Sequence, residues 1–361
     1  MNSFSTLIQG VLIFFGDTMQ DSLNDRSKQI LEAIIEDYIL TAEPVGSRTI
    51  TRRHPFALSP ATVRNVMSDL EEMGFLTSPH TSAGRVPTDK AYRFYVDTLL
   101  AVRQASRSER DEIRRRCRID GRDIGAVLRD TSRMLSSISH YMGVVVAPRF
   151  AAAVLRHIEF VKLSGSRILV ILVAQTGTVQ NKIIESDEEI SPDDLARMTN
   201  YLNGLLQGLT IAQIKSRLVE EMEDEKTKYD HLLAKALALS QQTLNDAGSE
   251  IFLEGQVNIM DLPEFADVSR MKEMFRAFEE KSLLVNLLDR CMEANGINIF
   301  IGSESRLSQM SDISLIASTY RTGRNSIGVL GVIGPTRMGY AKVIPIVDYT
   351  AKLVSRLLEG D

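Results

Sequence analysis

The chain has 361 residues, of which 44% are hydrophobic and 25% charged, with a formal net charge of −5 at pH 7. This composition predicts an ordinary soluble globular protein with two or three hydrophobic cores. It excludes a protein that coats nucleic acid by bulk positive charge. Cys117 and Cys291 are the two cysteines, and their spacing predicts neither a disulfide framework nor a zinc site. We therefore predict a cytoplasmic, multidomain α+β protein with no metal and no cofactor.

Residues 1–20 are predicted to form a tail outside the fold. Leu7–Phe15 is apolar, but it is too short to cross a membrane and no lysine or arginine precedes it, as a secretory signal would require. We expect no membrane partner. Met1 and Met19 both stay open as the translation start, because the first strong helical pattern begins only a few residues after Met19.

Two helices are predicted next. Apolar residues recur at helical spacing over 24–41, and either Asn24 or Asp25 is available as the N-cap. Pro44 cannot continue this helix but can open a new turn, so a short second helix is expected to follow and to end near residues 52–55.

A third helix is predicted from Ser59, because the sequence contains signals for both its start and its end. Ser59 can accept a hydrogen bond from a first-turn amide, Pro60 suits the first helical position, and Gly74 can adopt the left-handed conformation that closes a helix. The apolar residues at steps of three and four are expected to form its buried stripe: Val63, Val66, Met67, Leu70 and Met73.

Residues 75–88 are predicted to form a small hairpin. Ala83 and Gly84 lie between two short extended segments, Arg85 leaves the turn, and Pro87 ends the pairing. A helix, a short helix, a recognition helix and a wing together predict a winged helix-turn-helix domain over 21–102, a fold that binds double-stranded DNA.

The predicted DNA contacts lie on the second helix, the third helix and the wing. Arg64 and Asn65 are the expected base readers, because arginine matches the paired acceptors of guanine and asparagine the donor and acceptor of adenine. A winged helix used only for protein contacts is the alternative. The full predicted set is Ser47, Arg48, Arg52, Arg53, Ser59, Thr62, Arg64, Asn65, Ser82, Gly84 and Arg85.

Residues 103–125 are locally basic and are predicted to form a linker helix between domains, although the same arginines could follow a phosphate backbone. Beyond them, β-branched runs predict one central sheet that is split by an insertion. Its strands are expected at 141–146, 158–163, 168–174, 297–301, 313–319 and 326–333, followed by a helix over 340–358 that is kinked or restarted at Pro345. Helices are expected at 192–206 and 211–244, with an acidic patch at 220–225.

Five stretches closely resemble the HrcA family of bacterial heat-inducible transcription repressors: 31–39, 43–48, 58–65, 80–88 and 331–340. The resemblance implies a homodimer that represses chaperone operons of the groE and dnaK type by binding the inverted repeat called CIRCE. It also implies that the chaperonin GroEL keeps the repressor active. For the fold it implies a GAF-like domain, formed by 126–187 and 266–361, that is split by an inserted, largely helical dimerisation domain at 188–265.

Catalysis finds little support in the sequence. The five histidines have no metal spacing, no glycine-rich loop carries the lysine of a phosphate site, and no serine stands in a nucleophile elbow. The stronger rival to a heat-shock repressor is a winged-helix regulator that responds to a small molecule. In that hypothesis the GAF-like domain would hold an anionic effector near Arg321, Arg324 and Arg337.

Overall fold

The computed structural model describes most of the chain, with gaps. The described residues are 23–54, 58–79, 84–101, 103–117, 124–148, 154–175, 179–186, 189–206, 208–210, 213–214, 250–267, 296–306, 311–322 and 326–359, with a few more between 269 and 292. Several predicted features lie outside them: the N-terminal tail, Ser82, the acidic patch at 220–225 and most of the helix expected at 211–244. Within the described residues no helix is both long and apolar enough to span a bilayer.

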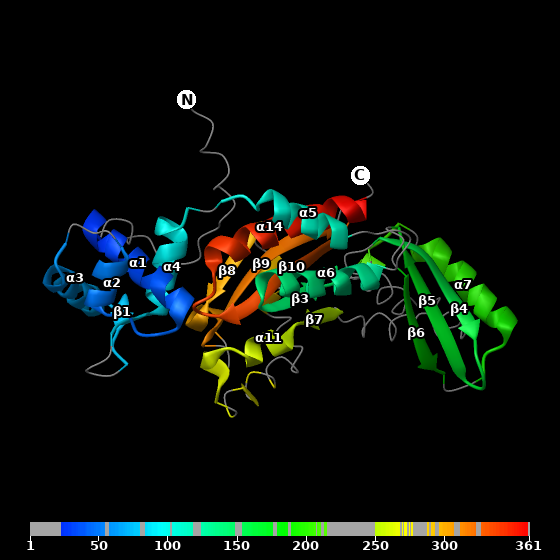
Figure 1. Ribbon diagram of the computed structural model, residues 1–361. Helices are drawn as coiled ribbons and strands as arrows, with labels where there is room; N and C mark the ends of the chain where they lie inside the picture. Colours follow the sequence, from blue (N-terminus) through cyan, green and yellow to red (C-terminus); the bar gives the residue numbers. More distant parts are fainter. Residues whose placement is uncertain are drawn as a thin grey trace.

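The N-terminal region consists of helices and one short hairpin at one end of the molecule (Figure 1). Asn24, rather than Asp25, caps the first helix, because its side chain accepts a hydrogen bond from the backbone N–H of Ser27 at 2.9 Å. The elements are α1 (Asp25–Thr41), α2 (Ser47–Arg53), α3 (Pro60–Glu72), β1 (Leu76–Thr77), β2 (Val86–Pro87), α4 (Asp89–Phe94) and a π-helical turn, η1 (Tyr95–Leu99).

The core of this region lies between α1, α2 and α3. The apolar stripe expected on α3 is buried at Val63, Val66, Met67 and Leu70. Met73 was wrongly placed in that stripe and is 46% exposed, because α3 ends at Glu72 and Met73 lies just beyond the helix. Gly74 follows with φ of 77°, the left-handed conformation expected at the end of this helix.

A five-stranded antiparallel sheet forms the centre of the molecule, with the strand order β7-β3-β10-β9-β8. β8 continues into a short 3₁₀ helix, η4 (Gly302–Ser305). The strands are β3 (Met142–Val146), β7 (Ile251–Glu254), β8 (Ile297–Ile301), β9 (Ile313–Thr322) and β10 (Ser326–Pro335).

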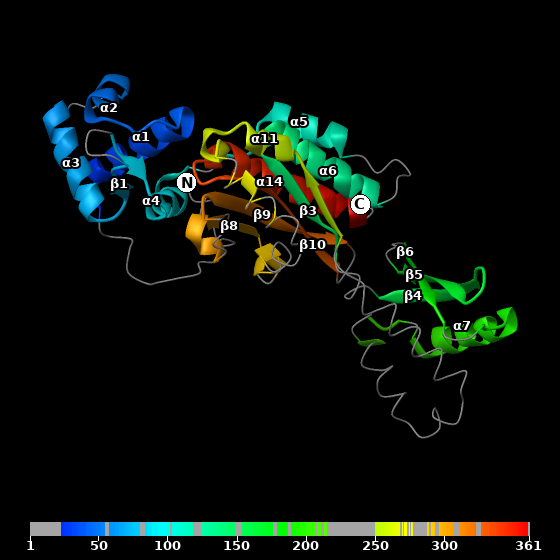
Figure 2. The ribbon, with the colours of Figure 1, turned by 90° about the horizontal axis from the view of Figure 1, so that it is seen from below.

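Both faces of this sheet are covered (Figures 1 and 2). Alternate residues point to opposite faces, so Val144 and Val146 enter one hydrophobic cluster while Val145 enters the other. One face packs against α6 (Ile124–Ser139) and α14 (Tyr340–Glu359), over which α5 (Arg107–Arg116) lies. The other face carries α11 (Gln256–Met260) and the 3₁₀ turn η3 (Pro263–Phe265).

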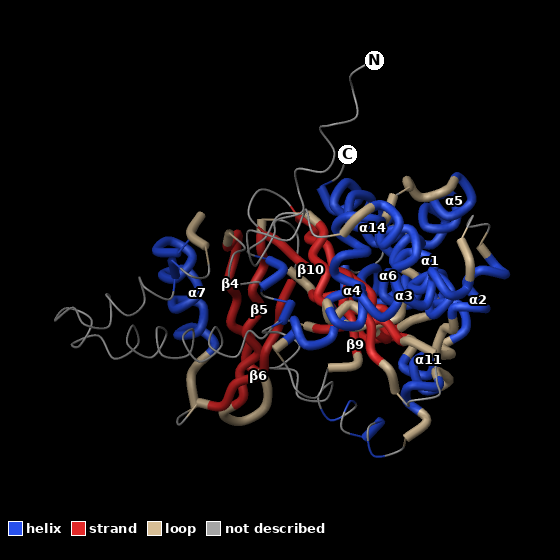
Figure 3. Tube along the Cα trace, turned by 90° about the vertical axis from the view of Figure 1, so that its left-hand side faces the viewer, coloured by secondary structure: helices blue, strands red, loops and turns tan. Residues whose placement is uncertain are grey.

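A second sheet lies apart from the first (Figures 1 and 2), although the two overlap in the view of Figure 3, and it corrects the predicted topology. The strands expected at 158–163 and 168–174 exist, but they form a separate antiparallel sheet, β4-β5-β6, rather than part of the central one. One face of this sheet packs on a helix through Ile158, Phe160, Leu195 and Leu202. The elements are β4 (Leu155–Lys162), β5 (Arg167–Ala174), β6 (Val179–Glu185) and α7 (Pro192–Leu206).

The excursion from the central sheet therefore begins after β3, not at residue 188, and the described part of it contains three strands besides a helix. It ends before β7, so residues 251–265 belong with the central sheet rather than with the insertion. β-branched runs identified six of these strands but missed β6 and β7, and they carry no information about which strands pair. The GAF-like and dimerisation assignments stay predictions.

Two further expectations concern helices. The basic segment does form a helix, but it packs on α6 and α14 through buried Ile113 and is not a free linker. Pro345 lies inside α14, which continues through it without restarting. Val343, Ile344 and Val347 of this helix are buried against the sheet, so packing retains the helix across the proline.

Candidate nucleic-acid interface

The recognition helix α3 presents two polar side chains to solvent from its N-terminal half. The Ser59 side chain accepts a hydrogen bond from the backbone N–H of Thr62 at 3.1 Å, and Pro60 is the first helical residue. Arg64 and Asn65 are exposed on the face opposite the buried stripe. Within the described part of the chain, neither side chain has a hydrogen bond or an ion pair. They are therefore available to an external ligand.

The shorter helix α2 adds two more exposed cations. Arg48 and Arg52 are four positions apart, so they lie one above the other on the same helix face. Their side chains likewise have no partner among the described residues. Ser47 is the first residue of α2, and its carbonyl accepts a hydrogen bond from the Thr51 hydroxyl at 2.7 Å.

Arg53, also in the predicted set, has an internal partner. Its guanidinium lies 3.4 Å from the carboxylate of Asp37, which is buried on α1. His54 lies 3.4 Å from the other oxygen of the same carboxylate. These contacts join the end of α2 to α1, so Arg53 is held in the helical scaffold and is less free than Arg48 or Arg52.

The wing is present and is tied to both neighbouring helices. Leu76 pairs with Pro87 and Thr77 with Val86. Val45 and Arg85 exchange two backbone hydrogen bonds of 2.9 Å, which attach the wing to the turn before α2.

Gly84 is required by the close approach of the wing to that turn. A β-carbon at this position would lie 2.5 Å from the backbone of Val45, a distance that real side chains do not reach. Gly84, which we predicted to contact DNA, therefore has a structural role in the packing of the wing.

Arg85 does not extend away from the wing. Its Nε donates to Glu71 of α3 at 2.8 Å and its Nη1 donates to Ser78 at 3.1 Å. The side chain thus fastens the wing to the recognition helix. A contact with DNA stays a prediction for Arg85, whose first role in this structure is to hold the wing in place.

Two acidic side chains of the domain lie close together on α1. Glu32 and Glu36 lie on α1, where burial and the charge of Glu36 raise the pKa of Glu32. Burial and the charges of both glutamates also raise the pKa of Tyr95 on η1 to about 12. The exposed arginines of α2 and α3 make the outer faces of these helices favourable for phosphate, although the domain as a whole is not strongly basic.

One of the three arginines in the effector hypothesis has an internal partner. Arg337, which we expected to meet an anion, instead pairs with Glu264 and donates to the carbonyl of Ile39 at 3.1 Å. Arg324 lies outside the described residues. A hollow beside the sheet, lined by Leu287, Phe300, Ser305, Ile313, Leu315 and Ile333, has a volume of about 10 Å³. That volume is about the room needed for one water molecule.

Sequence reasoning missed one group of polar residues altogether. Asp89 and Arg93 of α4 contact Ser303 and Glu304, which follow β8 more than 200 positions later in the chain. No local sequence pattern indicates a pair so far apart. These contacts join the winged helix to the central sheet.

Comparison with known proteins agrees with this architecture. A family model described as "Winged helix-turn-helix transcription repressor, HrcA DNA-binding" matches residues 22–98. A second, "HrcA protein C terminal domain", matches residues 125–344. A crystal structure described as that of a hypothetical protein superposes with a TM-score of 0.62 at 20% identity, covering 94% of this chain and 99% of that one. That likeness shows the fold.

Relatives in other bacteria are similar over nearly their whole length. The heat-inducible transcription repressor HrcA of Geobacter sulfurreducens is 69% identical over 339 residues, which cover 94% of this chain and 99% of the relative. The protein of the same name from Syntrophobacter fumaroxidans is 44% identical over 93% of this chain and 98% of the relative. The chain belongs to the HrcA family of heat-inducible transcription repressors, and its N-terminal winged helix-turn-helix is the DNA-binding domain of that family.

Proposed function

We propose that this repressor acts in the bacterial cytoplasm as a homodimer on the inverted repeat CIRCE, upstream of chaperone operons of the groE and dnaK type. Each α3 would enter the major groove of one half-site, with Arg64 and Asn65 on base edges and Arg48 and Arg52 on phosphates. The observation that carries this proposal is the pair Arg64 and Asn65, exposed on the outer face of a capped helix and without partners in the described chain.

A dimer is supported by the second sheet. Its face opposite α7 exposes Val161 (40%), Val179 (58%) and Ile183 (55%). The strand register places Val161, Leu169 and Ile183 in one row across the three strands. An exposed apolar face of this kind fits a protein interface, and two copies of the chain would mirror the two halves of an inverted repeat.

The proposed heat response links repression to chaperone supply. The family resemblance suggests that GroEL maintains the active form, so that heat, by loading the chaperonin with unfolded proteins, would relieve repression. Addition of purified chaperonin should then raise the fraction of repressor that binds the repeat. An unchanged active fraction over a range of chaperonin concentrations would argue against this part of the proposal.

Titration of labelled duplexes tests the DNA-binding part. The wild-type chain should prefer an inverted repeat over a scrambled duplex, and Arg64→Ala should lose about 10- to 100-fold in affinity for the repeat alone, since one bidentate base contact gives roughly 1–3 kcal/mol of discrimination. Arg26→Ala is the matched control, because Arg26 is an exposed arginine on α1 of the same domain. Equal effects of the two variants would contradict base reading by Arg64.

A winged helix used only for protein contacts makes the opposite prediction. In that case neither duplex should be bound preferentially, and Arg64→Ala should not change the binding of either one. The same titration, repeated with chaperonin present, separates this outcome from an inactive preparation.

A further inference from the structure

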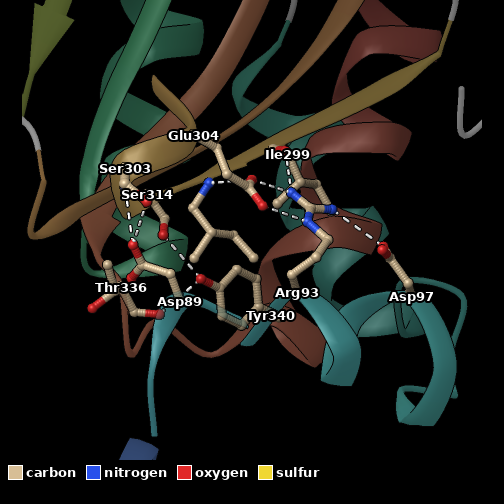
Figure 4. Close-up of polar contacts among 10 residues, drawn as sticks. Asp89, Arg93, Asp97, Ile299, Ser303, Glu304, Ser314, Thr336 and Tyr340 are labelled. Carbon is tan, nitrogen blue, oxygen red and sulfur yellow. Dashed lines mark hydrogen bonds and ion pairs between the residues drawn. The ribbon is translucent and has the colours of Figure 1, made fainter. Parts of the chain in front are cut away.

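Arg93 joins the DNA-binding domain to the central sheet through two groups, the Glu304 carboxylate and the Ile299 carbonyl (Figure 4). Its Nε and Nη2 donate to the two carboxylate oxygens of Glu304 at 2.9 and 2.5 Å. Nη2 also donates to the carbonyl of Ile299 on β8 at 2.6 Å, and Nη1 donates to Asp97 at 3.2 Å. Such a planar, bidentate contact fixes direction as well as distance.

Asp89 makes a second contact one turn earlier on α4. Its Oδ2 accepts hydrogen bonds from the backbone N–H of Ser303 at 3.0 Å and from the Ser303 hydroxyl at 2.8 Å. Gly302 allows this approach, since a β-carbon there would lie 2.5 Å from Oδ1 of Asp89. Gly302 also has φ of 51°, a conformation that favours glycine.

The contact is partly buried, and two further contacts between the same domains reinforce it. The side chains of Arg93 and Glu304 are about two-thirds covered, which makes their charges costly unless they stay paired. Tyr92 of α4 packs against Tyr340 of α14, with ring centroids 6.1 Å apart. Arg337 also reaches the winged helix, where it donates to the carbonyl of Ile39 at the end of α1.

We propose that Asp89 and Arg93 are positioning residues, which hold the winged helix-turn-helix at a fixed orientation on the central sheet and so set the separation of the two recognition helices in the dimer. We call the contacts of Asp89 and Arg93 with Ile299, Ser303 and Glu304 the domain clamp. The inference rests on the proposed dimeric binding to an inverted repeat.

A fixed orientation has a measurable consequence for operator choice. Two recognition helices read half-sites whose centres are one helical turn, or a multiple of it, apart. If each winged helix moved freely on a tether, the second half-site would be bound at an effective concentration that changes only slowly with spacing. A clamped pair instead binds tightly at one spacing and weakly at others.

The test measures affinity of the full-length chain for three kinds of duplex: the inverted repeat it binds best, the same repeat with the spacer lengthened by half a helical turn, and a single half-site. The wild-type chain should bind the first at least ~10-fold more tightly than the second. In Arg93→Ala this ratio should fall below about threefold, while half-site affinity stays unchanged because α3 and the wing are intact.

Two further variants make the result decisive. Gly302→Ala obstructs Asp89 from the sheet side without altering any charge, and it should lower the ratio in the same way. Arg133→Ala removes an arginine–glutamate pair of 3.3 Å between α6 and β7, away from the winged helix, and should leave the ratio unchanged.

Two outcomes would overturn the proposal. The first is an unchanged spacing ratio in both clamp variants. The second is loss of half-site affinity in both, which would show that the contacts serve folding of the winged helix rather than its orientation. Failure of the proposed function looks different, because the wild-type chain itself would then bind the repeat no better than a scrambled duplex.

Discussion

The winged helix and the second sheet lie at opposite ends of the molecule (Figures 1 and 2), and their surfaces differ in kind. At one end the outer faces of α2 and α3 carry arginines with no partner in the described chain, among them Arg48 and Arg64. At the other end the second sheet exposes Val179 and Ile183. Exposed cations suit phosphate, and an exposed apolar face suits a protein surface. We therefore predict that the proposed DNA contact and the proposed self-association can be altered separately, because they lie in regions on either side of the domain clamp.

The largest effect is expected from a charge placed on the apolar sheet face. Ile183→Lys should raise the dissociation constant of the dimer by roughly 100-fold, because a lysine in an apolar interface is desolvated without a partner. Sedimentation velocity over a range of concentrations measures this change. Affinity for the full repeat should fall with it, whereas affinity for a single half-site should stay the same.

Val257→Lys is the matched control for that variant. Val257 is also a highly exposed valine, but it lies on α11 beside the central sheet. If Val257→Lys dissociated the dimer and Ile183→Lys did not, the self-association surface would have to be sought at α11 instead of at the second sheet.

At the opposite end, Arg48→Ala should weaken binding to the repeat and to a scrambled duplex by a similar factor of about 3–10, because a phosphate contact carries no sequence information. The slope of log affinity against log salt concentration should become shallower by about 0.9 for each phosphate that no longer pairs with an arginine. The dimer constant should not change.

Arg53→Ala, a variant of the same helix, should affect DNA binding less than Arg48→Ala does. The guanidinium of Arg53 already faces buried Asp37, so its removal should change the salt slope less than the removal of Arg48 does. Identical slopes for the two variants would show that an internal partner does not prevent Arg53 from reaching DNA.

Features that depend on a few neighbouring residues could be predicted from the sequence. Ser59, Pro60 and Gly74 specify their helix through rules that act within a few residues, so α3 and its ends were predicted correctly. Exposure of Arg64 and Asn65 follows from the helical period of the buried stripe, and it too was within reach of the sequence.

Contacts between segments that are distant in the chain could not be predicted from the sequence. The internal bond of Arg85 to Glu71 depends on how the wing packs against α3, and the clamp joins Arg93 to Glu304 across 211 positions. Strand partners have the same difficulty, which is why the separation of β4–β6 from the central sheet was missed. Patterns along the chain identify elements, while the pairing of elements is decided by their packing in three dimensions.

A smaller effect is expected for the wing. Arg85→Ala removes the hydrogen bonds to Glu71 and Ser78, so it should lower the free energy of unfolding by about 1 kcal/mol and the affinity for the repeat by about threefold, as expected for a partly exposed pair. Urea unfolding and duplex titration give the two values. An affinity loss as large as that of Arg64→Ala, with unchanged stability, would mean that Arg85 contacts DNA directly.

The smallest effect is expected at the start of α5, the helix that follows the winged helix-turn-helix in the chain, where Glu109 takes part in the N-cap. Hydrogen bonds from Arg103, and then from Ser106, lower the pKa of the Glu109 carboxyl from 4.5 to about 2. Because the folded-state pKa lies below the unfolded one, this stabilisation is complete above about pH 4.5 and is lost as the pH falls towards 2. Glu109→Gln should therefore be less stable than the wild-type chain at pH 6, by less than about 1 kcal/mol since the group is near the surface. The difference should shrink steadily in unfolding experiments at pH 4 and pH 3. A difference that stayed constant over this range would mean that Glu109 stabilises the start of α5 through contacts that do not depend on its charge.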